Sequence, residues 1–362
     1  MTSRRIEPGQ IKRVVVRGTN WVGDAVMTVP ALRELRRVLP DARITLSTRS
    51  WAEGLFTDAE FIDDLLIYDR PPRSIRAVVR QTREWHKRGF DLALLLQNAF
   101  EAALLASASR VRFRVGYPTD GRRALLTHVV PLPTPGNQRH EVFYYLNLVA
   151  ELERLICGAS DIPARQPHIA LAVSDVRRDH ARELLSTRGL DSSRPIAVLC
   201  PGSTNSRAKR WPSEYYAALA DRLVTDEEAN VVLIGSPDEI DVSREVAMRM
   251  NQRPIILTGE TDLRAAVGVI SLADVVITND TGPAHIAAAL DRPTLVIFGP
   301  TDPTTTRPFS ARAEVVRRPP DCAPCMLRDC PIDHRCMTVI SPDEIFSRAS
   351  AMIGGRVVEV SL

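Results

Sequence analysis

Short apolar runs rich in Val, Ile and Leu alternate with amphipathic stretches along almost the whole chain. This alternation is typical of βαβ units, which build parallel sheets covered by helices. In the first half we expect strands at 12–18, 42–48 and 91–98, and helices at 25–39, 74–88 and 140–156. In the second half we expect strands at 195–202, 229–236, 253–259, 273–280 and 292–300, with helices that begin near Pro212, Ile240, Asp262, Pro283 and Ser341.

The pattern becomes irregular between residues 158 and 195, apart from one helix expected at 173–188. A chain of 362 residues is long enough for two domains. We therefore predict an α/β protein with an N-terminal Rossmann-like domain at 1–180 and a second one at 190–340, followed by a helix and tail at 341–362. Two such halves with parallel sheets would face each other across a central cleft.

Composition narrows the function classes. With 44% hydrophobic and 25% charged residues, the chain is an ordinary globular protein and not a disordered one. Its 47 basic and 44 acidic residues leave a net charge of +3, so nucleic acid is not expected as a partner. The N-terminus lacks a signal-peptide core, and no run approaches the roughly 20 apolar residues that span a bilayer. These features predict a cytoplasmic protein, at most peripheral to a membrane.

The turn after the first strand, RGTNWVGDAVMTVPAL, carries the first candidate residue, Asp24. This turn lacks both the GxGxxG fingerprint and the GK[ST] motif, which argues against a classical dinucleotide site and a P-loop. At the expected start of a helix, Asp24 could cap free N–H groups. A carboxylate placed there could also deprotonate a hydroxyl nucleophile. The residues alone leave both interpretations open.

The loop after the first strand of the second half, PGSTNSRAKRWP, has the chemistry of a diphosphate site. Gly202, Ser203 and Thr204 offer N–H groups and hydroxyls, and Lys209 and Arg210 bring positive charge just before a helix. Small residues, a cation and a helix N-terminus together favour an anion. The alternative is a solvated basic loop.

Two more strand ends carry polar residues. In TNDTGPAHIAAAL, Asp280 and Thr281 can bind a polyhydroxylated ligand, whereas His285 is either a phosphate donor or a packed core histidine. In GSPDE, Glu239 could bind two ribose hydroxyls or could simply complement a helix dipole. Ligands of open parallel sheets bind at such carboxyl ends, where the loops converge.

Taken together, WVGDAVMTVPAL, PGS…AKRWP, GETDL and TNDTGPAHIAAAL resemble the ADP-heptose:lipopolysaccharide heptosyltransferases, which form glycosyltransferase family 9. The similarity extends from about Val14 to Ile353, and WVGD and AKRWP are most like the heptosyltransferase II branch. The resemblance implies a GT-B fold of two Rossmann-like domains. The N-terminal half would bind the acceptor and the C-terminal half the nucleotide-sugar.

The resemblance also implies a role for each matching residue. Asp24 matches the catalytic base, and Lys209, with Ser203 and Thr204, matches the group that binds the diphosphate. Glu239 falls where the family holds the ribose or adenosine, with Thr261 near the same pocket. The motif that meets the heptose and phosphates matches Asp280, Thr281, Gly282 and His285. Cations for the phosphorylated acceptor match Arg114, Arg122 and Arg123.

The implied reaction is an inverting transfer of heptose from ADP-L-glycero-D-manno-heptose to the inner core of lipopolysaccharide (heptose I on Kdo–lipid A), at the inner face of the membrane. No cofactor is expected, and the lack of a DxD pair beside the nucleotide loops argues against a catalytic metal ion. Alternatives are another GT-B enzyme such as a nucleotide-sugar epimerase, or a heptosyltransferase with a different acceptor. A nicotinamide oxidoreductase would need the missing glycine fingerprint, and a non-catalytic nucleotide- or sugar-binding protein would not need Asp24.

Four of the six cysteines lie in CAPCMLRDCPIDHRC: Cys322, Cys325, Cys330 and Cys336. Their C-x2-C-x4-C-x5-C spacing departs from common zinc ribbons, yet four thiols with His334 nearby could hold a structural Zn²⁺ ion. The alternative is a loop of small thiols that binds nothing. In either case a stabilising role is expected.

Overall fold

The computed structural model describes residues 5–69, 74–133 and 140–355. The chain divides into two compact units between Ile169 and Ala170. Each unit contains a six-stranded sheet, and every strand pair is parallel. The predicted α/β class is therefore confirmed.

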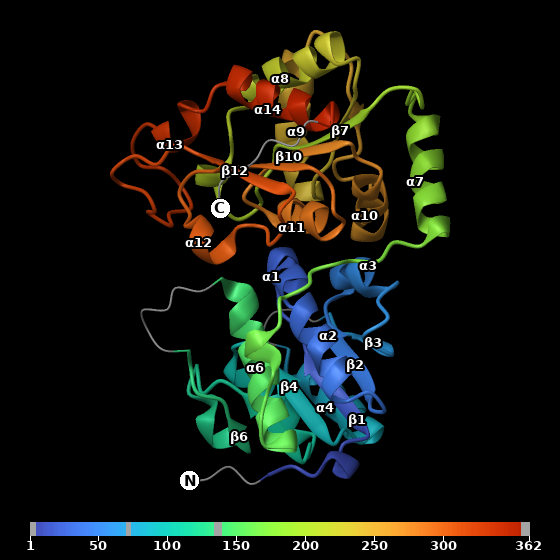
Figure 1. Ribbon diagram of the computed structural model, residues 1–362, viewed down its shortest axis with the longest axis vertical. Coiled ribbons are helices and arrows are strands. Elements are labelled where there is room, and N and C mark those ends of the chain that lie inside the picture. Colours follow the sequence, from blue (N-terminus) through green and yellow to red (C-terminus); the bar gives the residue numbers. More distant parts are fainter. Residues whose placement is uncertain (1–4, 70–73, 134–139, 356–362) are drawn as a thin grey trace. The chain divides into compact units, whose positions relative to one another are not determined.

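The sheet of the first unit has the strand order β3-β2-β1-β4-β5-β6 (Figure 1). The strands are β1 (Arg13–Arg17), β2 (Arg43–Thr48), β3 (Asp64–Ile67), β4 (Leu92–Leu95), β5 (Phe113–Gly116) and β6 (His128–Val129). This is the doubly wound order, in which the chain reverses direction beside the first strand. Val14, Leu92 and Leu94 are fully buried, as expected for parallel strands covered on both faces.

Helices cover the two faces of this sheet in separate groups. One group comprises α1 (Val22–Met27), α2 (Val29–Val38) and α6 (Glu141–Cys157), which contact one another. On the other face, α4 (Ile75–Arg88) packs against α5 (Phe100–Ala108). The short helix α3 (Glu53–Phe56) precedes β3, and a 3₁₀ turn covers Arg122–Leu125.

The second unit repeats this plan with the order β12-β11-β10-β7-β8-β9. Its strands are β7 (Ile196–Cys200), β8 (Asn230–Leu233), β9 (Ile255–Ile256), β10 (Val275–Asn279), β11 (Thr294–Phe298) and β12 (Ala313–Arg317). The reversal point lies between β7 and β10. The loops that follow these two strands are therefore where a ligand is expected.

The helices of the second unit also form two groups. On one face α8 (Ser213–Asp226) contacts α9 (Ile240–Arg249) and α14 (Pro342–Ile353). On the other, α10 (Leu263–Ser271) contacts α7 (Asp175–Thr187) and α11 (Gly282–Ala289). Two short helices, α12 (Pro303–Thr306) and α13 (Arg335–Thr338), complete the unit. No described helix is both long and apolar enough to cross a membrane.

Several boundaries differ from the sequence predictions. The structure divides at 169/170, before the predicted limits of 180 and 190, because α7 packs on α10. Helix α14, set apart in the predicted segment 341–362, packs on α8 and belongs to the second unit. The single helix predicted at 25–39 is two helices that meet at Thr28, whose hydroxyl donates to the Ala25 carbonyl at 2.6 Å.

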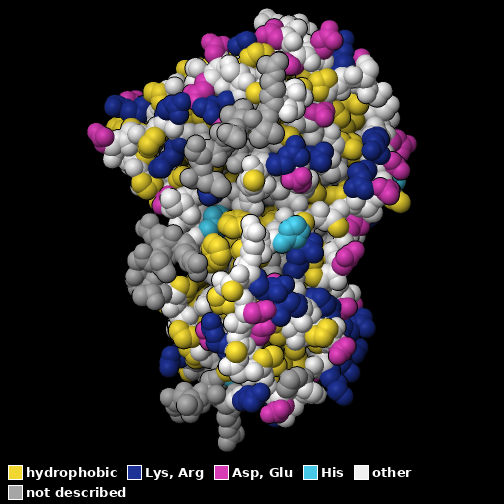
Figure 2. All heavy atoms as spheres, viewed as in Figure 1, with side chains coloured by type: hydrophobic (Ala, Val, Ile, Leu, Met, Phe, Trp, Pro, Cys, Tyr) yellow, Lys and Arg dark blue, Asp and Glu magenta, His cyan; other side chains and the backbone are white. Residues whose placement is uncertain are grey.

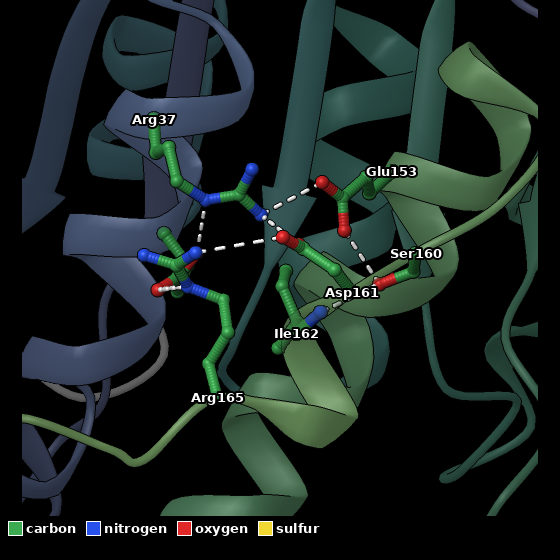
Figure 3. Close-up of polar contacts among 7 residues, drawn as sticks. Arg37, Glu153, Ser160, Asp161, Ile162 and Arg165 are labelled. Atoms are coloured by element: carbon green, nitrogen blue, oxygen red, sulfur yellow. Dashed lines mark hydrogen bonds and ion pairs between the residues drawn. The ribbon is translucent and has the colours of Figure 1, made fainter.

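An ion-pair network fastens the end of the first unit to α2 (Figure 3). The Arg37 guanidinium lies 2.7 Å from Glu153 of α6 and 2.9 Å from Asp161. Arg165 reaches Glu34 of α2 at 3.0 Å, so both arginines bridge segments far apart in the sequence. Bonds to Glu34 and Glu153 outweigh the effect of burial and raise the pKa of Arg37. Figure 2 shows Lys and Arg side chains interspersed with Asp and Glu over this unit.

Candidate active site

Asp24 lies in the turn that follows the carboxyl end of β1, at the reversal point of the first sheet. The structure places it inside the first turn of α1, after Trp21 at the N-cap. The N-cap interpretation of Asp24 is therefore wrong. A carboxylate at the ligand-binding edge of a doubly wound sheet is well placed for acid–base chemistry.

Glu141, the first residue of α6, is a second acid beside Asp24 that the sequence analysis missed. Burial and the negative charge of Asp24 together raise the pKa of the Glu141 carboxyl. Burial and the same charge also raise the pKa of Tyr145, one turn further along α6. The negative charge of Asp24 thus makes both neighbouring groups harder to ionise. No local motif marks Glu141, because only the packing of α1 on α6 brings the two acids together.

Two of the three arginines predicted to bind the acceptor donate hydrogen bonds to backbone carbonyls. Arg122 is fully buried and donates to the carbonyls of Tyr117, at 2.8 Å, and Gln97. Arg114 donates to the carbonyls of Leu125 at 2.6 Å and Val111 at 2.7 Å. These contacts favour a structural role in which the two side chains shape the loops at this edge. Arg123 is exposed.

The carboxyl edge of the second sheet is organised around the buried side chain of Asn279, at the end of β10. Its amide nitrogen donates to the carbonyls of Pro201 at 2.9 Å and Gly202 at 3.1 Å. Its oxygen accepts from the Trp211 N–H at 3.0 Å and the Tyr216 hydroxyl at 3.2 Å. One amide therefore joins both ends of the loop 201–211 to the neighbouring strand.

The next residue, Asp280, faces the predicted phosphate cation. Lys209 Nζ lies 2.7 Å from Asp280 Oδ2 and 3.1 Å from the Asp280 carbonyl. Asp280 is 5% exposed, and its Oδ2 also accepts from Thr301 Oγ1 at 2.7 Å. The structure thus brings together the two predicted groups and adds Thr301. The Lys209 side chain is a quarter exposed.

Glu239 links the loops after β7 and β8. Its Oε2 accepts from the Ser236 N–H at 2.7 Å, and its Oε1 accepts from Thr204 Oγ1 at 3.3 Å. Gly202 passes directly beneath this carboxylate, where any Cβ would overlap the Glu239 side chain. The close approach explains the glycine in the PGS motif. It also keeps Glu239 at the strand edge where a ribose could bind.

The other predicted donor residues lie around the same edge of the second sheet. Ser203 is buried and its carbonyl accepts from Arg210 at 2.9 Å. Thr281 is the N-cap residue of α11, Gly282 is its first residue, and His285 is buried one turn later. Thr261 follows β9, at the outer strand, and its hydroxyl donates to the Leu257 carbonyl at 3.5 Å.

The cysteine-rich segment 322–336 contacts the loop that carries Lys209. The Ala208 N–H donates to the Arg328 carbonyl at 2.9 Å, and His334 Nε2 lies 2.7 Å from the Ala208 carbonyl. Ser206 Oγ adds a bond to the Arg328 carbonyl at 3.2 Å. Both backbone groups of the residue before Lys209 are therefore held by this segment. The sequence could not indicate this, because the partners lie over a hundred residues apart.

Cys322, Cys325, Cys330 and Cys336 are free thiols that line one cavity of about 20 Å³, together with Ala208 and Pro300. Burial and the neighbouring sulfurs raise the pKa of Cys336 to about 11. Within the described ranges, no three His, Cys, Asp or Glu side chains are arranged as ligands of one metal ion. The structural Zn²⁺ ion stays a prediction.

Two parallel-sheet units with this strand order and ligand edge define a GT-B protein. The solved structure of E. coli ADP-heptose LPS heptosyltransferase II superposes with a TM-score of 0.81 at 26% identity and covers 95% of this chain and 99% of its own. The lipopolysaccharide heptosyltransferase 2 of Salmonella typhimurium is 30% identical over 311 residues, 84% of this chain and 88% of its own. That of Haemophilus influenzae, named a lipooligosaccharide heptosyltransferase 2, is 28% identical over 312 residues.

The family model for glycosyltransferase family 9 (heptosyltransferase) matches residues 78–335. The chain belongs to this family and is a glycosyltransferase. The match includes the second sheet and the loops at its carboxyl edge, with the Asn279 amide and the Lys209–Asp280 pair. The predicted family and the GT-B fold are both confirmed.

Replacing Asn279 tests whether its amide holds the loop 201–211. In Asn279→Ala, the carbonyls of Pro201 and Gly202 and the Trp211 N–H lose their bonds to the amide, and the Tyr216 hydroxyl keeps only its 3.4 Å bond to the Cys200 carbonyl. We expect a loss of about 3 kcal/mol or more in the free energy of unfolding. The melting temperature measured by thermal denaturation should fall by about 6 °C or more. Asn230→Ala, which also removes bonds to backbone carbonyls but at a surface site, is the control and should lose less. Equal losses would contradict the special role of Asn279.

The metal prediction is tested by elemental analysis of protein purified under reducing conditions. A site of four thiols predicts about one equivalent of zinc per chain. Cys325→Ser should then lower both the zinc content and the melting temperature. Less than about a tenth of an equivalent of zinc would rule out the site, because a structural metal centre is filled stoichiometrically.

Proposed function

We propose that the protein transfers heptose from ADP-L-glycero-D-manno-heptose to the inner core of lipopolysaccharide, with heptose I on Kdo–lipid A as the acceptor. The observation that carries the proposal is the Lys209–Asp280 pair at the reversal point of the second sheet, held by Asn279. Family membership and the names of the relatives support the sugar and the acceptor class.

The donor contacts follow from the chemistry of the strand ends. The diphosphate would bind at the loop with Ser203 and Thr204, where Lys209 supplies a cation, and at the N-terminus of α11. Glu239 would accept hydrogen bonds from the ribose hydroxyls. Asp280 holds Lys209 in the free protein. A bound diphosphate would compete for the same ammonium.

The reaction we propose is a single displacement with inversion. Asp24 takes the proton from an acceptor hydroxyl, whose oxygen forms a bond to the anomeric carbon while the bond from that carbon to ADP breaks. The electron pair leaves with the diphosphate. Lys209 and the N–H groups of α11 stabilise the negative charge that develops there. No cofactor takes part in this proposal.

Product analysis by mass spectrometry tests the proposed function. ADP-heptose is incubated with inner-core acceptors that carry, or lack, the first heptose. We expect one added heptose only on the acceptor that already carries one, together with release of ADP. Addition to the acceptor without heptose would overturn the acceptor assignment. Conversion of the nucleotide-sugar without any acceptor would instead favour an epimerase.

Asp24→Asn removes the proposed base while it keeps the size and polarity of the side chain. Turnover should fall by roughly 10² to 10⁴, because one general base supplies about that factor. Donor affinity and melting temperature should stay close to wild type. Glu141→Gln is the matched control, since it neutralises the neighbouring acid, and it should retain most activity. Near-normal kcat in Asp24→Asn would leave that residue with a structural role only.

Lys209→Met removes the cation proposed to meet the diphosphate. We expect a higher donor KM and a fall in kcat of roughly 10² to 10³, since the charge it meets grows in the transition state. Arg207→Met, in the same loop, is the control: its exposed ion pair with Asp329 should contribute little. If only the acceptor KM rises in Lys209→Met, the loop binds the other substrate.

A further inference from the structure

Helix α4 presents a strip of cations and aliphatic side chains to solvent. The helix buries Ala77, Gln81 and Trp85 against the sheet. On the opposite side Ile75 is 79% exposed and Val79 is 41% exposed. The exposed cations of the strip are Arg76, Arg80, Arg83 and Lys87. Positions three or four residues apart share a helix face, so these side chains form one continuous surface.

The cations of this strip are available to an external anion. Arg88 pairs with Glu84 at 2.7 Å on the edge of the strip. Among the residues that the structure describes, none of the four exposed cations forms an ion pair with a carboxylate. Four positive charges along one helix face attract negative charge, and this attraction weakens as salt screens it.

The position of α4 in the fold brings the strip to the substrate edge of the first unit. Helix α4 follows β3 and precedes β4, and both strands run parallel to β1. A helix that connects two parallel strands begins at the carboxyl edge of the sheet. Ile75 and Arg76 therefore lie toward the edge that carries the Asp24 turn.

We propose that this face of α4 binds the surface of an anionic phospholipid bilayer. The cations would contact headgroup phosphates, and Ile75 and Val79 would enter the boundary between headgroups and acyl chains. The two exposed aliphatic side chains favour a bilayer over a soluble polyanion, which offers no apolar phase. The inference rests on the proposed function, because a lipid-anchored acceptor requires the enzyme to work at a membrane surface.

Vesicle co-sedimentation of the full-length protein tests the surface. Vesicles of phosphatidylcholine alone are compared with vesicles that contain about one third phosphatidylglycerol, at low salt and at about 0.5 M salt. We expect binding to the anionic vesicles only, and weaker binding at high salt. Arg80→Glu/Arg83→Glu should reduce this binding by about tenfold or more. Arg244→Glu/Arg253→Glu, which reverses two exposed arginines of the second unit, should bind like wild type.

A second variant separates the bilayer from a soluble polyanion. Ile75→Ser/Val79→Ser keeps every charge and should weaken vesicle binding, whereas binding to duplex DNA should not change. Wild-type affinity for vesicles in either α4 variant would overturn the proposal. The proposal would also be overturned if Arg244→Glu/Arg253→Glu lost as much vesicle binding as Arg80→Glu/Arg83→Glu. Tighter binding of the wild type to duplex DNA than to anionic vesicles at the same salt would overturn it too.

Transfer assays distinguish failure of this surface from failure of the proposed function. Arg80→Glu/Arg83→Glu should transfer more slowly to an acceptor embedded in anionic vesicles and at the wild-type rate to a deacylated acceptor. If the variant transfers to both acceptors at the wild-type rate, the proposed membrane-binding face of α4 is contradicted. Absence of transfer by the wild type to either acceptor would contradict the proposed function, whatever the vesicle binding.

Discussion

The hydrogen bonds of the Asn279 side-chain amide are the interactions on which the carboxyl edge of the second sheet depends. This amide is fully buried at the end of a central strand, and its hydrogen bonds reach both ends of the loop 201–211. A buried amide with this many partners is costly to disturb, because buried polar groups that lose a hydrogen bond are not compensated by water. The position of Lys209 follows from it, since that residue lies in the fixed loop and faces Asp280, the neighbour of Asn279.

The two units use the same strand order for different chemistry. In the first unit the reversal point carries acids: Asp24 after β1, with Glu141 nearby on α6. In the second unit the corresponding point carries a cation, hydroxyls and helix N–H groups. A nucleophile needs a base, and a diphosphate leaving group needs positive charge. In the proposed displacement, the first unit would therefore activate the nucleophile and the second would stabilise the leaving group, although both units have the same strand order.

The sequence predicted the elements that have strong local signals. Apolar runs located β1, β7 and β10, and polar strand ends located Lys209, Asp280 and Glu239. Weaker signals were missed: β5 and β12 are short and contain charged residues, and the Ala-rich helix α5 has little amphipathic character. Arg122 was expected at the acceptor from the family resemblance, and the fold buries its side chain among the carbonyls of Tyr117 and Gln97. The roles of Asn279, Glu141 and His334 also depend on partners that only tertiary packing brings close.

The most direct test of the central claim is a crystal structure of the protein with ADP bound. The account predicts a diphosphate oxygen within hydrogen-bond distance of Lys209 Nζ and of the backbone at Ser203 and Thr204, with the Asn279 hydrogen bonds unchanged. The ribose should lie beside Glu239. A nucleotide bound elsewhere, with the Lys209–Asp280 pair intact and remote from it, would contradict the account.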